Sequence, residues 1–271
     1  MTQLTVSKAK AEFVTLSDGQ IIAAYPQVFH ARAPWVVFSN SLATDHSIWS
    51  AQVEALAGRW NILRYDQRGH GASPEPSALS GFDRLGADVV ELLDRLGVKR
   101  AAYVGLSMGV PTGLAAVAAA PDHFSGLLLA DGQARTAPGG GQQWRERIAF
   151  VQEQGLAAFA PVTASRWLAD PTGERLARLE AMIARTPLDG FVACAGALAD
   201  FDFTAGLSQI DCPVLLVAGE RDGKLPETMR AMADLIPGAR FETIAEAGHV
   251  PCFERPDAFN ATMLAFLETL T

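Results

Sequence analysis

The feature that most constrains the fold is residues 101–121, a segment that carries no charged side chain. An α-helix that crosses a membrane needs about 20 consecutive apolar residues, so the length of this segment alone would allow a membrane span. Three glycines and Pro111 interrupt it, however, and alanine supplies much of the remainder. Such a pattern favours a buried strand over 102–105, a tight turn, and a buried helix over 108–119.

Short apolar runs alternate with helical patterns along most of the chain. Several runs are apolar throughout, as expected of strands that are buried on both faces. This alternation predicts a mostly parallel, doubly wound sheet with helices on both faces. The first two strands would form a hairpin with a type I′ turn at Asp18-Gly19. The predicted strands are residues 12–17, 20–25, 35–39, 61–65, 102–105, 127–130, 214–218 and 240–243, and the predicted helices that flank them are 48–57, 82–96, 108–119, 227–235 and 257–270.

The alternation stops between about residues 134 and 205, where only helical patterns occur. A helical insertion between two strands of a doubly wound sheet would lie over the carboxyl ends of the strands, where ligands bind. We therefore predict a core formed by residues 1–133 and 206–271 and a helical lid formed by 134–205. The predicted lid helices are 142–154, 155–168, 173–184 and 190–199.

The composition of the chain excludes several classes of protein and partner. The chain has 271 residues, of which 49% are hydrophobic and 19% charged, which excludes a disordered or coiled-coil protein. Its 30 acidic and 22 basic side chains give a net charge of −8, so neither nucleic acid nor a membrane is expected as a partner.

Residues 1–10 lack the apolar stretch of a signal peptide. Cys194, Cys212 and Cys252 match neither a zinc site nor a disulfide framework, which favours the cytoplasm. No pattern indicates an oligomeric state.

The segment Gly105-Leu106-Ser107-Met108-Gly109 matches the pattern G-x-S-x-G, and it lies between the predicted strand and helix. This context is typical of a nucleophilic serine on a sharp strand-to-helix turn. Glycine suits both ends of the motif, because bulk there would clash with neighbouring backbone. The N-terminus of the helix also offers free N–H groups to a developing oxyanion. The alternative is a glycine-rich turn without chemistry.

A nucleophilic serine needs a base and an acid, which in this type of fold follow it in the order Ser, acid, His. His249 lies in a loop after the last predicted strand and is our candidate base, whereas His123 is typical of a surface loop. Asp222 follows the strand before it and is our candidate acid. Glu220 in the same loop is better explained as a solvated carboxylate. The predicted catalytic residues are Ser107, Asp222 and His249.

An oxyanion needs two backbone N–H donors. We expect the first from Met108, the residue after the nucleophile, and the second from Leu42, in the loop after the predicted strand 35–39. The glycine-rich turn over residues 66–73 is interpreted as architectural, so His70 is not assigned to catalysis.

The order of these motifs resembles that of the α/β-hydrolase family, and the resemblance covers the whole chain. Within the family, the sequence is most similar to bacterial 3-oxoadipate enol-lactonases. The similarity rests on Ser39-Asn40-Ser41-Leu42, the serine motif, Trp144-x-x-Arg147-Ile148, Gly155-Leu156, Arg166-Trp167, Thr186-Pro187-x-x-Gly190-Phe191, Cys194-x-x-Ala197-Leu198 and the segment 254–260. The resemblance implies the α/β-hydrolase fold, with an eight-stranded, mostly parallel sheet and an inserted helical lid.

The resemblance also implies a serine hydrolase that opens the ring ester of 3-oxoadipate enol-lactone through an acyl-enzyme. Its partner would be a small-molecule lactone or ester, with no metal or other cofactor. The carboxylate of this substrate needs local cations or N–H donors. Trp144, Arg147, Arg166 and Trp167 are suitable substrate contacts in the lid. Alternatively, the tryptophans pack the lid onto the core and the arginines extend into solvent.

The sequence departs from the enol-lactonase pattern near the predicted site. Val110 and Ala43 stand where glycine is usual, and residues 224–225 and 250–252 differ from those expected after the acid and the base. We expect Cys252 only to pack. Because a fold does not fix a substrate, the chain could instead be a carboxylesterase, another lactonase or a C–C bond hydrolase. A hydrolase-like receptor that binds a ligand is the alternative from a different class.

Overall fold

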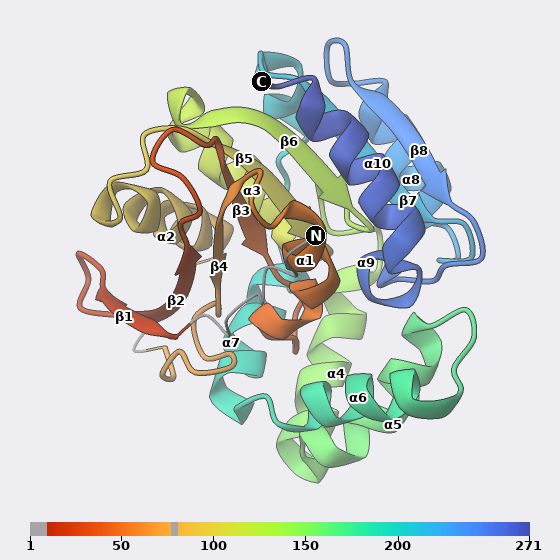
Figure 1. Ribbon diagram of the computed structural model, residues 1–271. Helices are drawn as coiled ribbons and strands as arrows, with labels where there is room; N and C mark the ends of the chain where they lie inside the picture. Colours follow the sequence, from red (N-terminus) through yellow and green to blue (C-terminus); the bar gives the residue numbers. More distant parts are fainter. Residues whose placement is uncertain (1–9, 77–80) are drawn as a thin grey trace.

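The computed structural model describes residues 10–76 and 81–271, so nine of the ten residues searched for a signal peptide lie outside the described part. An eight-stranded sheet forms its centre, with the order β1-β2-β4-β3-β5-β6-β7-β8 (Figure 1). The pairs β1·β2 and β2·β4 are antiparallel and all other neighbours are parallel. All eight predicted strands are present: β1 (Glu12–Thr15), β2 (Ile21–Gln27), β3 (Trp35–Ser39), β4 (Asn61–Tyr65), β5 (Ala101–Leu106), β6 (Phe124–Ala130), β7 (Val214–Gly219) and β8 (Arg240–Ile244).

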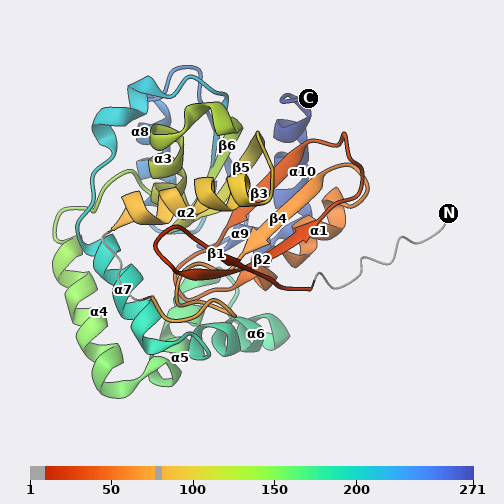
Figure 2. The ribbon, with the colours of Figure 1, turned by 90° about the vertical axis from the view of Figure 1, so that its left-hand side faces the viewer.

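Helices cover both faces of this sheet (Figure 2). One face carries α2 (Phe82–Arg95), α3 (Gly109–Ala119) and α8 (Leu225–Ala233). The other carries α1 (Ser50–Leu56), α9 (Pro251–Glu254) and α10 (Pro256–Glu268). The sequence pattern does not predict α9, because a single turn is too short to show a helical period. Three short 3-10 helices complete this part: η1 (His46–Trp49), η2 (Pro121–His123) and η3 (Thr204–Gln209).

Side chains of the central strands alternate between two apolar layers. In β3, Val36 and Phe38 belong to the layer that contains Phe259 of α10, whereas Val37 belongs to the layer that contains Leu92 of α2. All five side chains are fully buried. Burial on both faces explains why this strand reads as a continuous apolar run rather than an alternating one.

The hairpin between β1 and β2 forms, but the prediction of a type I′ turn is wrong. That turn needs positive φ at both central residues; Gly19 has a φ of 84°, whereas Asp18 is not among the described residues with positive φ. The N–H of Gly19 donates to the carbonyl oxygen of Leu16 at 3.0 Å. The N–H of Leu16 donates to the carbonyl oxygen of Gln20 at 2.8 Å. Asp18 is instead held by an ion pair with the buried Arg68, at 2.7 Å.

Between β6 and β7 the chain forms four helices that gather at one end of the sheet (green to cyan in Figure 1). They are α4 (Gly140–Gln154), α5 (Leu156–Trp167), α6 (Gly173–Ala184) and α7 (Leu188–Ala199). We call residues 134–205 the insertion. Its two ends meet in an antiparallel bridge between Arg135 and Asp202, so the segment leaves and rejoins the core at one place.

The insertion contacts the core through backbone at α7. A Cβ atom placed on Gly190 would lie 1.9 Å from the carbonyl oxygen of Gly69, in the turn over residues 66–73. The next turn of α7 adds a contact of 3.9 Å between Cys194 Sγ and the carbonyl oxygen of Arg68. Glycine at position 190 therefore permits an approach that no other residue would allow.

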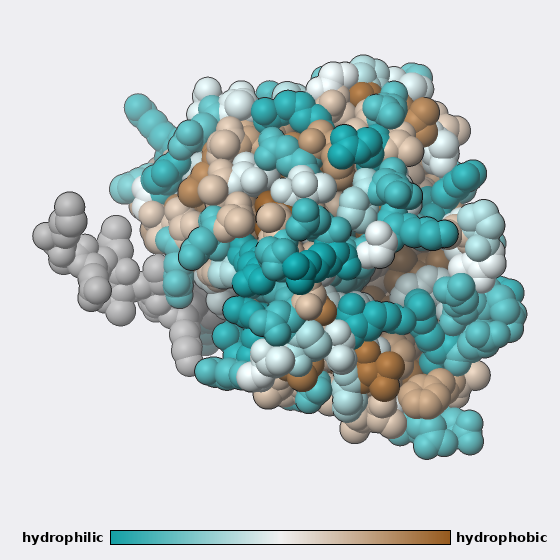
Figure 3. All heavy atoms as spheres, turned by 90° about the vertical axis from the view of Figure 1, so that its right-hand side faces the viewer, coloured by the Kyte–Doolittle hydropathy of each residue, from teal (hydrophilic) through white to brown (hydrophobic). Residues whose placement is uncertain are grey.

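On the face shown in Figure 3, hydrophilic side chains dominate and apolar ones form small, separate patches. Within residues 10–76 and 81–271, no helix has both the length and the apolar character needed to cross a bilayer. Cys194, Cys212 and Cys252 are free and buried, and the cytoplasmic location inferred from them stays a prediction.

We expect Gly190→Ala to lower the free energy of unfolding by about 1–3 kcal/mol, because the added methyl group forces two backbones apart. Gly196→Ala on the same helix is the matched control, since a Cβ there would have no heavy atom within 4 Å. The control should be neutral or stabilising by up to about 1 kcal/mol, from helix propensity alone. Thermal or denaturant unfolding of both variants measures the difference in stability. A Gly190→Ala protein that is as stable as the control would contradict the close contact between Gly190 and Gly69.

Candidate active site

Ser107 lies at a sharp turn between β5 and α3, with a left-handed φ of 52°. A Cβ on Gly105 would lie 2.5 Å from the carbonyl oxygen of Gly109, and one on Gly109 would lie 2.6 Å from that of Ser39. The N–H of Ser107 donates to the carbonyl oxygen of Ala130 at 2.7 Å, which ties the turn to the end of β6. The two glycines of the motif therefore permit close backbone packing that holds an unfavourable conformation at the serine.

The three predicted catalytic side chains lie in one hydrogen-bonded row. His249 Nε2 is 2.9 Å from Ser107 Oγ, and His249 Nδ1 is 2.7 Å from Asp222 Oδ2. Burial alone would raise the pKa of Asp222, but the charge of His249 and its hydrogen bond hold the pKa below the ordinary value. The carboxylate can then only accept, so Nδ1 carries a proton and Nε2 is left to accept the hydroxyl proton of Ser107.

Separate elements bring these residues together. Asp222 follows β7, and His249 lies between β8 and α9. The N–H of His249 donates to the carbonyl oxygen of Trp167 at the end of α5, at 2.8 Å, and the two rings lie 5.2 Å apart between centroids. Glu220, the alternative acid, is exposed and accepts a hydrogen bond from the N–H of Glu246. The insertion therefore contacts the candidate base directly.

The two expected oxyanion donors also lie near the serine. Neither the N–H of Leu42 nor that of Met108 has an acceptor within the described part of the chain. Leu42 lines the same cavity as Ser107. Met108 is fully buried at the N-cap of α3, the end of a helix where N–H groups are free.

The loop that carries Leu42 is held by His70. Ala43 has a left-handed φ of 59°, and its N–H donates to His70 Nε2 at 3.0 Å. His70 Nδ1 lies 3.0 Å from the carbonyl oxygen of Arg68, which can only accept, so Nδ1 carries the proton. Burial lowers the pKa of His70 and keeps the ring neutral. Ala43 thus occupies a conformation that favours glycine, and its hydrogen bond to His70 helps to hold it there.

A cavity of about 560 Å³ lies between the core and the insertion. Ser107, Asp222 and His249 line it, together with aromatic side chains of the insertion such as Phe191. All four side chains proposed from the sequence as substrate contacts also line it: Trp144, Arg147, Arg166 and Trp167. Arg221 and Lys224 add two further cationic groups to the lining.

Two arginines that line the cavity, Arg147 and Arg166, have no acidic partner. The Arg147 guanidinium lies 4.5 Å from the centroid of the Trp144 ring. Within the described residues, neither Arg147 nor Arg166 forms an ion pair with a carboxylate. Burial lowers the pKa of Arg147, and the charge of Arg166 lowers it further. Two cations that destabilise each other therefore face a cavity in a protein of net charge −8.

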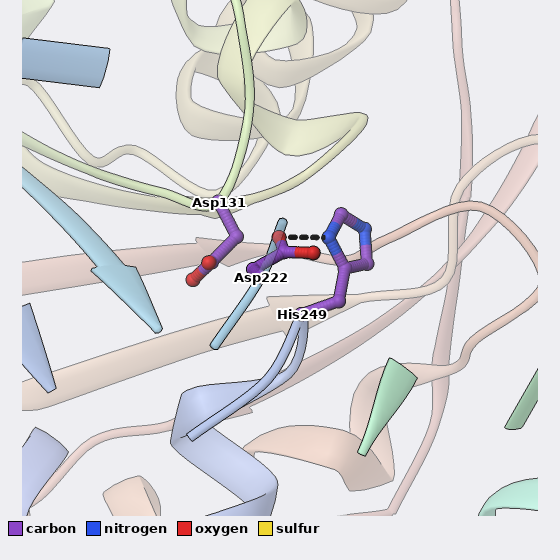
Figure 4. A group of neighbouring side chains, drawn as sticks. All are labelled: Asp131, Asp222 and His249. Atoms are coloured by element: carbon purple, nitrogen blue, oxygen red, sulfur yellow. Dashed lines mark hydrogen bonds and ion pairs between the residues drawn. The ribbon is translucent and has the colours of Figure 1, made fainter. Parts of the chain in front are cut away.

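The sequence reasoning missed Asp131, a fully buried carboxyl directly after β6. Figure 4 shows it beside Asp222, on the side away from His249. A carboxylate at the carboxyl end of a predicted parallel strand was the available signal. These three residues are the described group whose spacing would suit a metal ion. We assign no metal here, because Nδ1 of His249 is bonded to Asp222 and Nε2 to Ser107.

Comparison with known proteins identifies the family of the chain. The family described as the alpha/beta hydrolase fold matches residues 34–256. 3-Oxoadipate enol-lactonase 2 of Acinetobacter baylyi is 33% identical, over 94% of this chain and 96% of its own. A candidate carbamate hydrolase, RutD, of Caulobacter sp. (strain K31) is 32% identical, over 86% of this chain and 90% of its own.

A solved structure shows the same likeness. The crystal structure of the enol-lactonase from Burkholderia xenovorans LB400 is 33% identical, with a TM-score of 0.89 over 95% of this chain and all of that one. The sheet order, the helices on both faces and the match over residues 34–256 lead to one conclusion. The chain belongs to the α/β-hydrolase family.

Proposed function

We propose that this chain is a serine hydrolase that opens the ring ester of 3-oxoadipate enol-lactone to give 3-oxoadipate. The observation that carries the proposal is the row of Ser107, His249 and Asp222 in a cavity that also holds two unpaired arginines. The row suits ester cleavage, and the arginines suit a substrate with a carboxylate. The names of the relatives from Acinetobacter baylyi and Burkholderia xenovorans support this substrate.

In the first step, His249 Nε2 takes the proton of Ser107 Oγ as that oxygen attacks the lactone carbonyl carbon. The bond between this carbon and the ring oxygen then breaks, which leaves an acyl group on Ser107 and an enol oxygen in the same molecule. His249 returns its proton to the enol oxygen, and the enol rearranges to a ketone. Conversion to the ketone makes ring opening favourable.

In the second step, His249 Nε2 takes a proton from water, which attacks the acyl carbon. The bond to Ser107 Oγ breaks, Oγ regains the proton, and the product acid leaves. In both steps the carbonyl oxygen becomes an oxyanion, for which the N–H groups of Leu42 and Met108 are the donors we propose. One such donor contributes about 3–4 kcal/mol to the transition state in comparable sites.

We propose the insertion, residues 134–205, as a lid that supplies the substrate-binding wall. Arg147 and Arg166 would hold the carboxylate of the substrate, and Trp144 and Trp167 would cover its apolar part. This division follows from the lining of the cavity, where all four side chains come from α4 and α5.

The first test measures hydrolysis of 3-oxoadipate enol-lactone by the wild type and by Ser107→Ala, with a neutral p-nitrophenyl ester alongside. We expect a kcat/KM for the lactone of at least about 10⁴ M⁻¹s⁻¹ and a loss of about 10³-fold or more in the variant. Turnover of the ester alone would retain a serine hydrolase and reject the lactone. Turnover of neither would favour a receptor or the carbamate chemistry of the Caulobacter relative's name, which a carbamate assay would then separate.

Replacing Arg147 or Arg166 with alanine should raise KM for the lactone about 10-fold or more, because a charged hydrogen bond contributes about 1.5–3 kcal/mol. KM for the neutral ester should change little, since it has no carboxylate. Arg145→Ala is the matched control, because Arg145 lies on α4 but is exposed and bonded to Gln142. An equal loss on both substrates would show that the arginines only maintain the fold.

His70→Leu should lower kcat about 10-fold while KM changes little, because Ala43 loses the acceptor that holds the loop of Leu42. His70→Gln offers an amide oxygen in place of Nε2 and should recover part of kcat. Steady-state kinetics of the two variants, with circular dichroism to check folding, provide the measurement. If both variants kept full kcat, His70 would have no part in positioning this loop.

A further inference from the structure

Asp131 is held rigidly behind the candidate acid. It has a left-handed φ of 45° and is fully buried. Its N–H donates to the carbonyl oxygen of Val217 at 2.9 Å. Its Oδ1 accepts a hydrogen bond from the N–H of Gly219 at 2.8 Å. Both bonds tie it to β7, the strand that leads to Asp222, so its carboxyl group has a fixed orientation.

The second oxygen of Asp131 is unusual. Oδ2 is buried and has no hydrogen-bond donor within residues 10–76 and 81–271. One side-chain oxygen of Asp131, one of Asp222 and one ring nitrogen of His249 all lie within 4.8 Å of one another. Asp131 and His249 lie on opposite sides of Asp222 (Figure 4). An ionised Asp131 would therefore place a second buried negative charge against Asp222, and its Oδ2 would have no donor to stabilise it.

We propose that Asp131 is a neutral acid whose Oδ2–H donates a hydrogen bond to the carboxylate of Asp222, and that it is a positioning residue for the proposed acid. This inference rests on the proposed roles of Asp222 and His249. Because Gly219 occupies Oδ1, the proton is assigned to Oδ2. The bond accounts for the one atom of Asp131 that otherwise has no partner.

The charges around Asp131 favour its neutral form. Burial raises its pKa well above the ordinary value of an aspartate, and the charges of Asp222 and Glu254 raise it further. Glu254 itself is held by the N–H groups of Asp170 and Gly248, at 2.9 and 2.7 Å. The other titratable neighbours are His249, Arg166 and Cys252. His249 and Arg166 act on Asp222 and lower its pKa, and burial raises the pKa of the Cys252 thiol well above its usual value. These groups therefore do not oppose the neutral form of Asp131.

The proposed bond has a consequence for the base. A donor on Asp222 stabilises its ionised form and spreads its negative charge, so Asp222 stabilises the imidazolium form of His249 less than a free carboxylate would. Loss of the donor should then move the acidic limb of the pH–kcat/KM profile to higher pH. Loss of a negative charge at the same place would move the limb to lower pH.

Asp131→Asn and Asp131→Ala separate these possibilities. The asparagine amide can accept from Gly219 and donate to Asp222, as the neutral acid does, but it cannot ionise. We expect Asp131→Asn to keep the acidic limb and to retain kcat/KM within about 3-fold. Asp131→Ala should lose about 10-fold and shift the limb to higher pH by about 0.5. These losses correspond to about 0.6 and 1.4 kcal/mol.

The profile is measured with the neutral p-nitrophenyl ester, so a wrong lactone assignment leaves the test intact. The infrared band of a protonated carboxyl group is recorded in parallel and needs no turnover. It should be present in the wild type at neutral pH and absent in Asp131→Asn. Thermal unfolding checks that each variant folds, and if Asp131→Ala does not, the asparagine variant and the infrared band decide.

Three results would overturn the proposal. An acidic limb that moves to lower pH in Asp131→Asn would show that the native residue is ionised. A folded Asp131→Ala with the profile of the wild type would show that no positioning bond exists. A wild-type spectrum without the protonated carboxyl band would remove the proton itself. Loss of activity in Ser107→Ala tests the serine mechanism separately.

Discussion

The geometry of the candidate site depends on the strained backbone at Ser107. A left-handed conformation costs a residue with a side chain about 1–2 kcal/mol, so the surrounding packing must hold it. Gly105 and Gly109 allow β3, β5 and α3 to approach one another more closely than side chains would permit. Ser107 lines the cavity, and the same turn places Met108 at the N-cap of α3. The orientation of Ser107 is thus a property of the backbone around it.

Cationic side chains line the cavity from both the insertion and the core. Arg147 and Arg166 come from the insertion, and Arg221 and Lys224 come from the core, where Asp131 stands behind Asp222. The net charge of −8 would repel an anionic ligand from most of the surface. Arg147 and Arg166 provide local positive charge at the cavity. Arg166 also lowers the pKa of Asp222, so the insertion and Asp222 are electrostatically linked.

Local patterns in the sequence predict the sheet, most helices and the three residues of the hydrogen-bonded row, because each of the three lies in a loop or turn that follows a predicted strand. The sequence patterns do not predict features that depend on the exact loop geometry or on contacts between distant segments. The type I′ turn is wrong because Leu16 bonds to Gln20, and only Gly19 is left-handed among the three residues between them. His70 is buried and holds backbone, as an architectural residue does, but its partner Ala43 lies 27 residues away and the local pattern does not show it. Asp131 has a local signal, but its partner lies on another strand.

The contact between Gly69 and Gly190 limits how the cavity can open. It joins α7 to the turn that carries His70, and His70 in turn holds the loop of Leu42. A movement that swung all four insertion helices away as one rigid body would break this contact and release the loop. A movement that kept this contact would instead need a hinge within the insertion, with α7 staying on the core while other helices moved.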